Sequence, residues 1–192
     1  PPLFMDLREN EQVLDMAAAP GGKTCEMACI ENVMITACEK NKIRCDRLKY
    51  NLEKQGVKRV NVLEEDARSL DDFFSFDKIL LDAPCSGSGT LDECDLDEEL
   101  VNRSIKVQEQ LLRKAIKLVK KGGIIVYSTC SILKEENEEI IKKFIGKELE
   151  IIPISIDDEL PFLKTGIDGT ICLYPNGIYE GFFIAKLRKV VD

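Results

Sequence analysis

The chain has 192 residues, which suffices for one compact domain and excludes a multidomain assembly. Apolar residues make up 44% and charged residues 32%, a balance typical of a globular protein rather than a disordered or fibrous one. The net charge is −8, from 27 basic and 35 acidic residues. The overall field therefore does not attract a polyanion, and any nucleic acid must be held locally.

Histidine is absent, which excludes histidine-dependent nucleophilic catalysis and histidine metal sites. Acid and base chemistry is left to carboxylates, thiols, lysine and tyrosine. The eight cysteines include no CxxC pair, and the chain opens on nothing like a signal peptide, so we expect reduced thiols, no bound metal and a cytoplasmic location. No apolar run is long enough to cross a bilayer, so no membrane is expected.

Short apolar runs alternate with amphipathic stretches from residue 12 onward, at the spacing of β-α-β units. Strands are predicted at 13–17, 33–38, 60–63, 78–82 and 124–128. Helices are predicted at 23–29, 40–54, 97–120 and 134–145. This order predicts an α/β fold with a mostly parallel, doubly wound sheet.

The pattern changes after residue 146. A strand near 149–154, a stretch rich in Pro and Gly at 161–181 and a closing strand at 182–187 follow one another. They predict an antiparallel β-hairpin with a long loop at the C-terminal edge of the sheet. The whole chain, 1–192, is thus expected to form one domain.

Small residues connect the first predicted strand to the first helix. The connection comprises Ala17, Ala18, Ala19, Pro20, Gly21, Gly22 and Lys23. Small side chains let a ligand approach the backbone, and the helix N-terminus offers free amides, so the loop predicts a nucleotide-type cradle. A plain strand-to-helix turn that needs small residues for packing is the alternative.

A phosphate-binding P-loop is a second interpretation of this segment, because the Gly22-Lys23-Thr24 ending matches it. An apolar strand ending in Asp82 also resembles the one that holds magnesium in such proteins. However, the P-loop requires glycine at the position of Ala17, and Pro20 removes a backbone amide that a phosphate would use. The sequence therefore disfavours nucleotide hydrolysis.

Acidic residues stand at the ends of three predicted strands. Glu39 follows the second strand, Asp66 follows the third, and Asp82 ends the fourth. Ligands of open α/β sheets bind at the carboxyl ends of the strands, so we expect these side chains to line one cleft. Glu39 would be able to accept both hydroxyls of a ribose. Taken singly, such a residue is most often a solvated loop carboxylate or a helix cap, but three at corresponding strand ends favour a binding site.

Two cysteines follow the fourth and fifth predicted strands. Cys85 lies in DAPCSGSGT and Cys130 in YSTCS. If these strands are neighbours, both thiols face one cleft, where a cation such as Lys23 can favour a thiolate nucleophile. A lone cysteine is more often a buried, inert packing residue. That interpretation is given to the other six, which are Cys25, Cys29, Cys38, Cys45, Cys94 and Cys172.

Four motifs together resemble the catalytic domain of the Sun family of RNA cytosine methyltransferases. They are AAPGGKT, DAPCSGSGT, GGIIVYSTCSI with the EENE behind it, and the closing GFFIAKL. The resemblance runs from residue 12 to residue 189. It implies a Rossmann-like class I methyltransferase fold, S-adenosylmethionine as cofactor, and methylation of carbon 5 of cytosine in rRNA or tRNA. A monomer is expected.

The resemblance also implies which residues hold the cofactor. The loop from Ala17 to Lys23 would surround its methionine part. Glu39 would bind the ribose and Asp66 the adenine edge, while Asp82 would lie where cofactor and base meet.

The family mechanism implies roles for the two cysteines. Carbon 5 of cytosine is a poor nucleophile until a thiolate adds to carbon 6, and the resemblance gives this role to Cys130 of the Thr-Cys motif. Cys85 would help to remove the carbon 5 proton and release the product. Asp82, if protonated or sharing a proton with the base, would stabilise charge at ring nitrogen 3. The reverse assignment of the two cysteines stays open, because the Pro-Cys cysteine is the nucleophile in related DNA enzymes.

The chain also departs from the family pattern. Six carboxylates lie between residues 92 and 99, where arginine and proline are usual; such a run repels phosphates, although acids also suit a helix N-terminus. Asn176 replaces a usual histidine and Ala17 a usual cysteine. Family members carry N-terminal RNA-binding parts, so the chain is expected to be a fragment lacking them. The alternative function is a catalytically weak or inactive module that binds the cofactor or assists RNA assembly.

Overall fold

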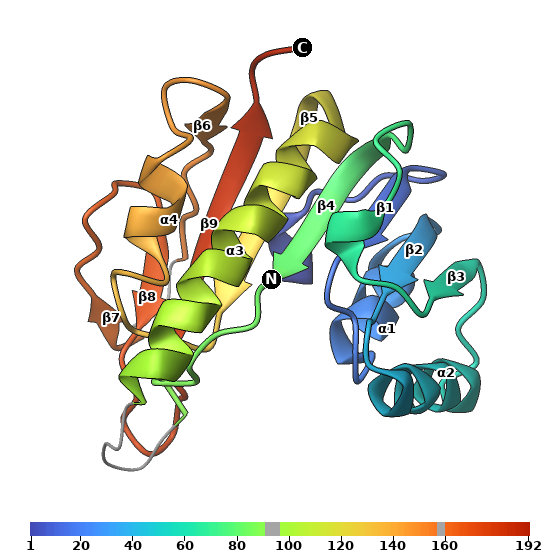
Figure 1. The fold of residues 1–192 in the computed structure, drawn as a ribbon, viewed down its shortest axis with the longest axis horizontal. Coiled ribbons are helices and arrows are strands. Elements are labelled where there is room, and N and C mark those ends of the chain that lie inside the picture. Colours follow the sequence, from blue (N-terminus) through green and yellow to red (C-terminus); the bar gives the residue numbers. More distant parts are fainter. Residues whose placement is uncertain (91–96, 157–159) are drawn as a thin grey trace.

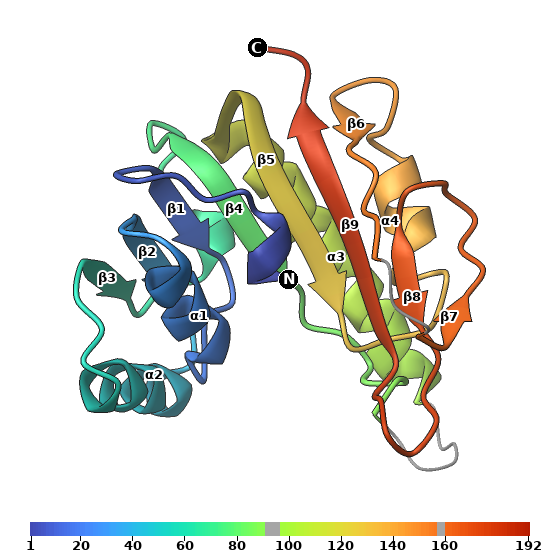
Figure 2. The same cartoon turned by 180° about the vertical axis from the view of Figure 1, so that it is seen from behind.

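The computed structural model describes residues 1–90, 97–156 and 160–192, which form one sheet with helices on both faces (Figures 1 and 2). The strands are β1 Gln12–Asp15, β2 Met34–Cys38, β3 Val60–Leu63, β4 Phe76–Asp82, β5 Val119–Thr129, β6 Leu149–Ile151, β7 Phe162–Leu163, β8 Ile171–Leu173 and β9 Phe182–Lys189. The α-helices are α1 Gly22–Ile30, α2 Lys42–Lys54, α3 Glu98–Leu118 and α4 Glu138–Lys142. Two short 3-10 helices cover Pro2–Phe4 and Ala67–Ser69.

The strand order is β3-β2-β1-β4-β5-β9-β8-β7, with β6 also paired to β9. The first five strands are parallel, and β9 runs antiparallel to β5, β6 and β8. The chain proceeds outward from β1 to β2 and β3, then returns to the other side of β1 with β4. Loops on both sides of this reversal diverge, which opens a crevice at the carboxyl ends of β1 and β4.

The core lies on both faces of the sheet because side chains alternate along each strand. In β4, Leu80 packs with the α1 and α2 side chains, while Ile79 and Leu81 pack with α3 and α4. Figure 1 shows α3 and α4 in front of the sheet, and Figure 2 shows α1 over the opposite face. Both faces are therefore shielded, as a parallel sheet requires.

The predicted fold class is confirmed: the sheet is mostly parallel, with antiparallel strands at its C-terminal side. All five predicted parallel strands are present, and the predicted closing strand is β9. The 161–181 stretch contains β7 and β8 in addition to loops, which the Pro and Gly content concealed. None of the described helices is long and apolar enough to cross a bilayer.

Three predicted helices are shorter than expected. The second begins at Lys42, where the Asn41 side chain caps it by accepting a hydrogen bond from the Arg44 N–H. The third ends at Leu118, and β5 begins at the next residue.

The fourth predicted helix covers only Glu138–Lys142, because residues 134–137 form turns that carry Glu136 and Asn137 into the interior. The Glu136 side chain accepts hydrogen bonds from Ser86 and Gln108, and the Asn137 side chain donates to the Ser131 carbonyl. The helix therefore begins only after these two residues.

Part of the acidic run lies outside the described residues, and so does Cys94. Within the described part, the Asp97 carboxylate caps α3 by accepting a hydrogen bond from the Glu99 backbone N–H at 2.9 Å. Glu98 and Glu99 lie in the first turn of α3, where the helix dipole favours negative charge. For these three residues the structure supports the helix-start interpretation.

Phe183 of β9 provides a test of how far the sheet depends on its last strand. The ring is fully buried and meets Tyr127 of β5 edge-on, with centroids 6.3 Å apart. We expect Phe183→Ala to lower the free energy of unfolding by about 3–5 kcal/mol, since it leaves a cavity beside Tyr127 in the core that α3 and α4 cover. Phe73→Ala is the matched control, because Phe73 is 97% exposed. Equal losses for the two variants in urea denaturation would contradict this packing.

Candidate active site

The small-residue loop between β1 and α1 is held by side chains of α2. Arg44 donates a hydrogen bond to the Ala19 carbonyl at 3.0 Å, and Asn51 donates to the Pro20 carbonyl at 2.7 Å. Gly21 has a φ of +108° and packs so closely on Leu48 that an added Cβ would lie 2.9 Å from Leu48 Cδ1. Gly21 therefore shapes the turn, which leaves its small neighbours to face the crevice.

Two cavities open at this crevice, with volumes of about 300 and 330 Å³. Of the predicted site residues, the first is lined by Ala17, Ala19, Glu39, Asp66, Asp82, Cys85 and Cys130. The second is lined by Ala17, Ala18, Ala19, Pro20, Gly22, Lys23 and Asp82, together with Asp15 and Glu26. Apart from Gly21, every predicted site residue thus lies on one of the cavities, and Asp82 belongs to both.

Glu39 presents a carboxylate in the first cavity although its side chain is only 4% exposed. One oxygen accepts a hydrogen bond from the Asn41 backbone N–H at 2.8 Å, and the other lies 3.5 Å from the Arg44 guanidinium. These contacts fix the carboxylate at the end of β2. Arg44 also lines the cavity and was not predicted as a site residue, since its place depends on how α2 packs.

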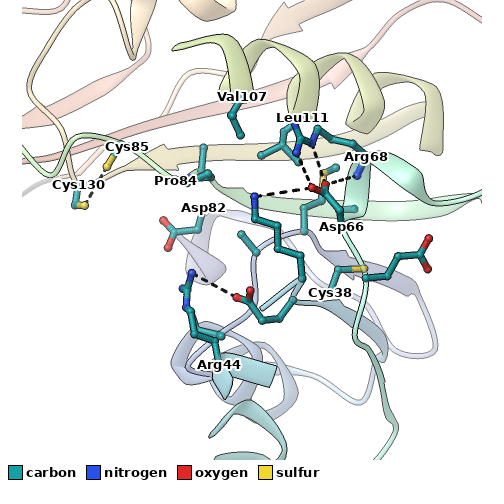
Figure 3. A pocket seen from close by; sticks show the side chains of 18 residues that line it. Cys38, Arg44, Asp66, Arg68, Asp82, Pro84, Cys85, Val107, Leu111 and Cys130 are labelled. Carbon is teal, nitrogen blue, oxygen red and sulfur yellow. Dashed lines mark hydrogen bonds and ion pairs between the residues drawn. The ribbon is translucent and has the colours of Figure 1, made fainter. Parts of the chain in front are cut away.

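Asp66 pairs with Arg68 at the other end of this cavity (Figure 3). The Arg68 Nε donates to one Asp66 oxygen at 3.0 Å, and a terminal nitrogen donates to the other at 2.6 Å. These hydrogen bonds hold the pKa of Asp66 below its usual value. The Lys40 ammonium lies 3.9 Å from the same carboxylate. Arg68 is a further lining residue that the sequence analysis did not identify.

Asp82 ends β4 between the two cavities and is held from both sides. The Lys23 ammonium lies 2.7 Å from one oxygen, and the Ser128 hydroxyl donates to the other at 2.7 Å. Ser128 is the residue that faces Asp82 in the β4–β5 pairing. Lys23, proposed from the sequence as a cation for a thiolate, thus bonds to Asp82, and the Phe182 ring lies 5.7 Å from its ammonium.

The thiols of Cys85 and Cys130 face each other with their sulfur atoms 3.1 Å apart (Figure 3). A hydrogen bond from Cys85 lowers the pKa of Cys130 to about 7. The same contact, together with burial, raises the pKa of Cys85 well above the usual thiol value. One proton shared by two thiols therefore favours a thiolate at Cys130 and a neutral thiol at Cys85.

Backbone contacts join the loops that carry these thiols. The Gly89 N–H donates to the Cys130 carbonyl at 3.0 Å, and the Gly181 N–H donates to the Gly89 carbonyl at 2.7 Å. A Cβ on Gly89 would overlap the Gly181 carbonyl, so glycine is required at this crossing. The Ser88 and Ser131 hydroxyls lie 2.8 Å apart. The thiol pair is thus fixed by contacts between three segments.

The other described cysteines stand apart from this pair. Cys38, Cys45 and Cys172 are buried, as expected for packing residues. Cys25 is half-buried, and Cys29 is exposed on α1, so the expectation of a buried side chain was wrong for Cys29. The helical spacing of the two residues did not reveal which face of α1 meets solvent.

Asp15 is a buried carboxylate that the sequence analysis did not select. It ends β1, lines the second cavity and accepts a hydrogen bond from the Thr24 hydroxyl at 2.7 Å. Burial raises the pKa of Asp15 from 3.8 to about 6. Its position at the end of a strand was the available signal, the same one that identified Glu39, Asp66 and Asp82.

The chain is similar in sequence to known RNA methyltransferases. The family model described as 16S rRNA methyltransferase RsmB/F matches residues 2–188. A tRNA (cytosine(72)-C(5))-methyltransferase from Pyrococcus horikoshii is 39% identical, over 98% of this chain and 49% of that protein. A ribosomal RNA small subunit methyltransferase F from Vibrio vulnificus is 35% identical, over 99% of this chain and 43% of that protein.

The chain is also similar to solved structures of related proteins. NSun6 from Pyrococcus horikoshii, described as with SFG, superposes with a TM-score of 0.89 at 37% identity, covering 100% of this chain and 51% of that one. A methyltransferase homologue from the same organism superposes with a TM-score of 0.85 at 35% identity, covering 99% and 65%. The chain spans about half the length of the curated relatives it matches.

The buried carboxylate of Asp15 predicts a pH-dependent loss of stability. Its pKa in the folded chain lies above the unfolded value, so the fold disfavours the ionised form. Raising the pH from about 4 to about 7 should cost up to about 3 kcal/mol of unfolding free energy at this residue. Asp15→Asn should remove this cost while its amide oxygen still accepts from Thr24.

Urea denaturation of both proteins at several pH values isolates this effect from other titrating groups. The variant should gain stability over the unmodified chain as the pH rises through the interval. A stability difference that does not change with pH would contradict the raised pKa of Asp15.

Proposed function

Because the chain belongs to the 16S rRNA methyltransferase RsmB/F family, we propose that it is the catalytic domain of an RNA cytosine carbon-5 methyltransferase that uses S-adenosylmethionine. One observation carries the proposal: the thiols of Cys85 and Cys130 lie 3.1 Å apart, and both residues line one cavity with Asp82. Methylation of carbon 5 needs a nucleophile that adds to the ring and a second group that later takes a proton. These three side chains provide that set.

The residues of both cavities suit the cofactor. When bound, S-adenosylmethionine supplies a methyl group on a positively charged sulfur. Asp15, Glu26 and Asp82 surround the second cavity with carboxylates, which favours the positive charges of the methionine part. In the first cavity, the Glu39 carboxylate can accept hydrogen bonds from two ribose hydroxyls. Ala17 and Ala19 line both cavities, and their small side chains leave the backbone accessible where the cavities meet.

Cys130 is the proposed nucleophile, which its lowered pKa supports. Its thiolate forms a bond to carbon 6 of cytosine, and the ring electrons move so that carbon 5 becomes electron-rich and can take the methyl group. Asp82, whose carboxyl is held by Lys23 and Ser128, stabilises the negative charge that develops at ring nitrogen 3 by sharing a proton with the base.

Cys85 is proposed to complete the reaction. Once the Cys130 sulfur is bonded to carbon, it no longer holds a negative charge beside Cys85. The Cys85 thiol can then release its proton to solvent, and the resulting thiolate accepts the carbon 5 proton, after which the carbon–sulfur bond breaks and Cys130 leaves as a thiolate. At a separation of 3.1 Å, the ionisation of one sulfur atom depends on the state of the other.

The proposed partner is rRNA or tRNA, since the named relatives act on these molecules. The target base must leave its stack to reach thiols that lie at the end of a cavity. With a net charge of −8, this domain is proposed to rely on other parts of the protein for RNA affinity. The intact group of Asp82, Cys85 and Cys130 favours an enzyme over an inactive module. We further propose that it acts as a cytoplasmic monomer without metal.

Calorimetric titration tests the cofactor. S-adenosylmethionine should bind, and ATP with magnesium should not. Glu39→Ala should weaken binding roughly 10–100-fold, because it removes a charged acceptor from the cavity. Glu64→Ala is the matched control, since Glu64 is exposed and does not line the cavity. Binding of ATP in place of S-adenosylmethionine would overturn the proposal.

Single cysteine variants test the chemistry on tRNA and small-subunit rRNA. Cys130→Ala should neither methylate RNA nor form an adduct, because the nucleophile is gone. Cys85→Ala should accumulate a covalent RNA adduct, because the carbon 5 proton is not removed. Denaturing gel electrophoresis detects the adduct, and Cys29→Ala is the control, since this thiol is exposed on α1. An adduct with Cys130→Ala would reverse the two roles.

A further inference from the structure

Glu136 is a fully buried carboxylate directly behind the thiol pair. One oxygen accepts hydrogen bonds from the Ser86 backbone N–H at 2.8 Å and from the Gln108 amide at 3.2 Å. The other accepts from the Ser86 hydroxyl at 2.6 Å. Among the described residues, no lysine or arginine forms an ion pair with it. A buried carboxylate held only by neutral donors is costly and needs a reason.

The contacts of Glu136 link the two loops that carry the thiols. Ser86, which donates to it twice, is the residue after Cys85. On the β5 side, the Tyr127 hydroxyl donates to the Glu136 carbonyl at 2.6 Å. The next residue, Asn137, donates to the Ser131 carbonyl at 2.9 Å, one residue after Cys130. The segment therefore holds the position of each sulfur relative to the other.

The charge of Glu136 acts unequally on the two thiols. The contact with Cys130 and burial are the main causes of the raised pKa of Cys85, and the charge of Glu136 adds to them. The charged side chains that act on Cys130 are instead Asp82, which raises its pKa, and Lys23, which lowers it. The phenol of Tyr127 also faces this region, and burial beside Glu136 and Cys85 raises its pKa, so it stays neutral.

We propose that Glu136 is a positioning residue that assigns the two thiols their different roles: it fixes the Cys85 loop against Cys130 and makes Cys85 the poorer site for a negative charge. The roles themselves rest on the proposed function. Glu136 touches neither sulfur through a hydrogen bond; it acts through Ser86 and through its field. Glu136, which does not line the cavity, therefore contributes to the choice of nucleophile together with residues that do.

Alkylation by iodoacetamide tests this inference, because the reagent reports thiolates and requires neither cofactor nor RNA. The ratio of modified Cys130 to modified Cys85 is measured by peptide mass spectrometry at neutral pH. Glu136→Gln keeps the size of the side chain and can keep its hydrogen bonds if the Ser86 hydroxyl turns to accept one. We expect the ratio to fall roughly tenfold, because loss of the Glu136 charge favours a thiolate at Cys85.

Glu135→Gln is the matched control, since Glu135 is the exposed neighbour and loses the same charge. It should leave the ratio unchanged. A purely structural role for Glu136 would loosen the site and raise the alkylation of both thiols together, whereas the proposed role raises that of Cys85 alone. An unchanged ratio in folded Glu136→Gln overturns the inference.

If Glu136→Gln does not fold, Ser86→Ala tests the positioning role of Glu136 instead. It keeps the charge of Glu136 but removes one tether of the Cys85 loop. The hydrogen bond from Cys85 to Cys130 should weaken, and the pH midpoint of Cys130 alkylation should rise from about 7 toward the usual thiol value. An unchanged midpoint overturns the positioning role. Failure of the chain to methylate RNA contradicts the proposed function and leaves the alkylation result intact.

Discussion

The parallel pairing of β4 with β5 is the constraint on which the site depends. It sets Asp82 opposite Ser128, so the segments that follow both strands leave the sheet at the same edge. Cys85 follows Asp82 by three residues, and Cys130 follows Ser128 by two, which places their thiols together. A shift of this register by one residue would turn alternate side chains to the opposite face and separate the pair.

Much of the fold was predictable because apolar runs with clear boundaries identify buried parallel strands. The residues at their carboxyl ends were predictable for the same reason, and Glu39, Asp82 and Cys130 all lie in the first cavity. The pairing of Lys23 with Asp82 and the entry of Glu136 into the interior were not predicted. Both depend on distances between segments far apart in the chain, which no local periodicity records.

The carboxylates around the crevice illustrate how environment separates chemically identical groups. Asp15 has no cationic hydrogen-bond donor among the described residues, and burial raises its pKa. Asp66 lies against Arg68, which lowers its pKa. Glu136 is buried among neutral donors and acts on Cys85. The carboxyl groups near this crevice thus differ in their surroundings and in their effects, which the net charge of the chain does not reveal.

The place of β9 in the sheet has a consequence for synthesis on the ribosome. This strand follows the other described strands in the chain, yet it lies between β5 and β8 and leads out of Gly181, which bonds to the Cys85 loop at Gly89. A nascent chain that stops short of residue 182 leaves β5 with an open edge able to pair with another chain. The backbone contact that Gly181 makes with the Cys85 loop therefore forms only near the end of translation of this domain.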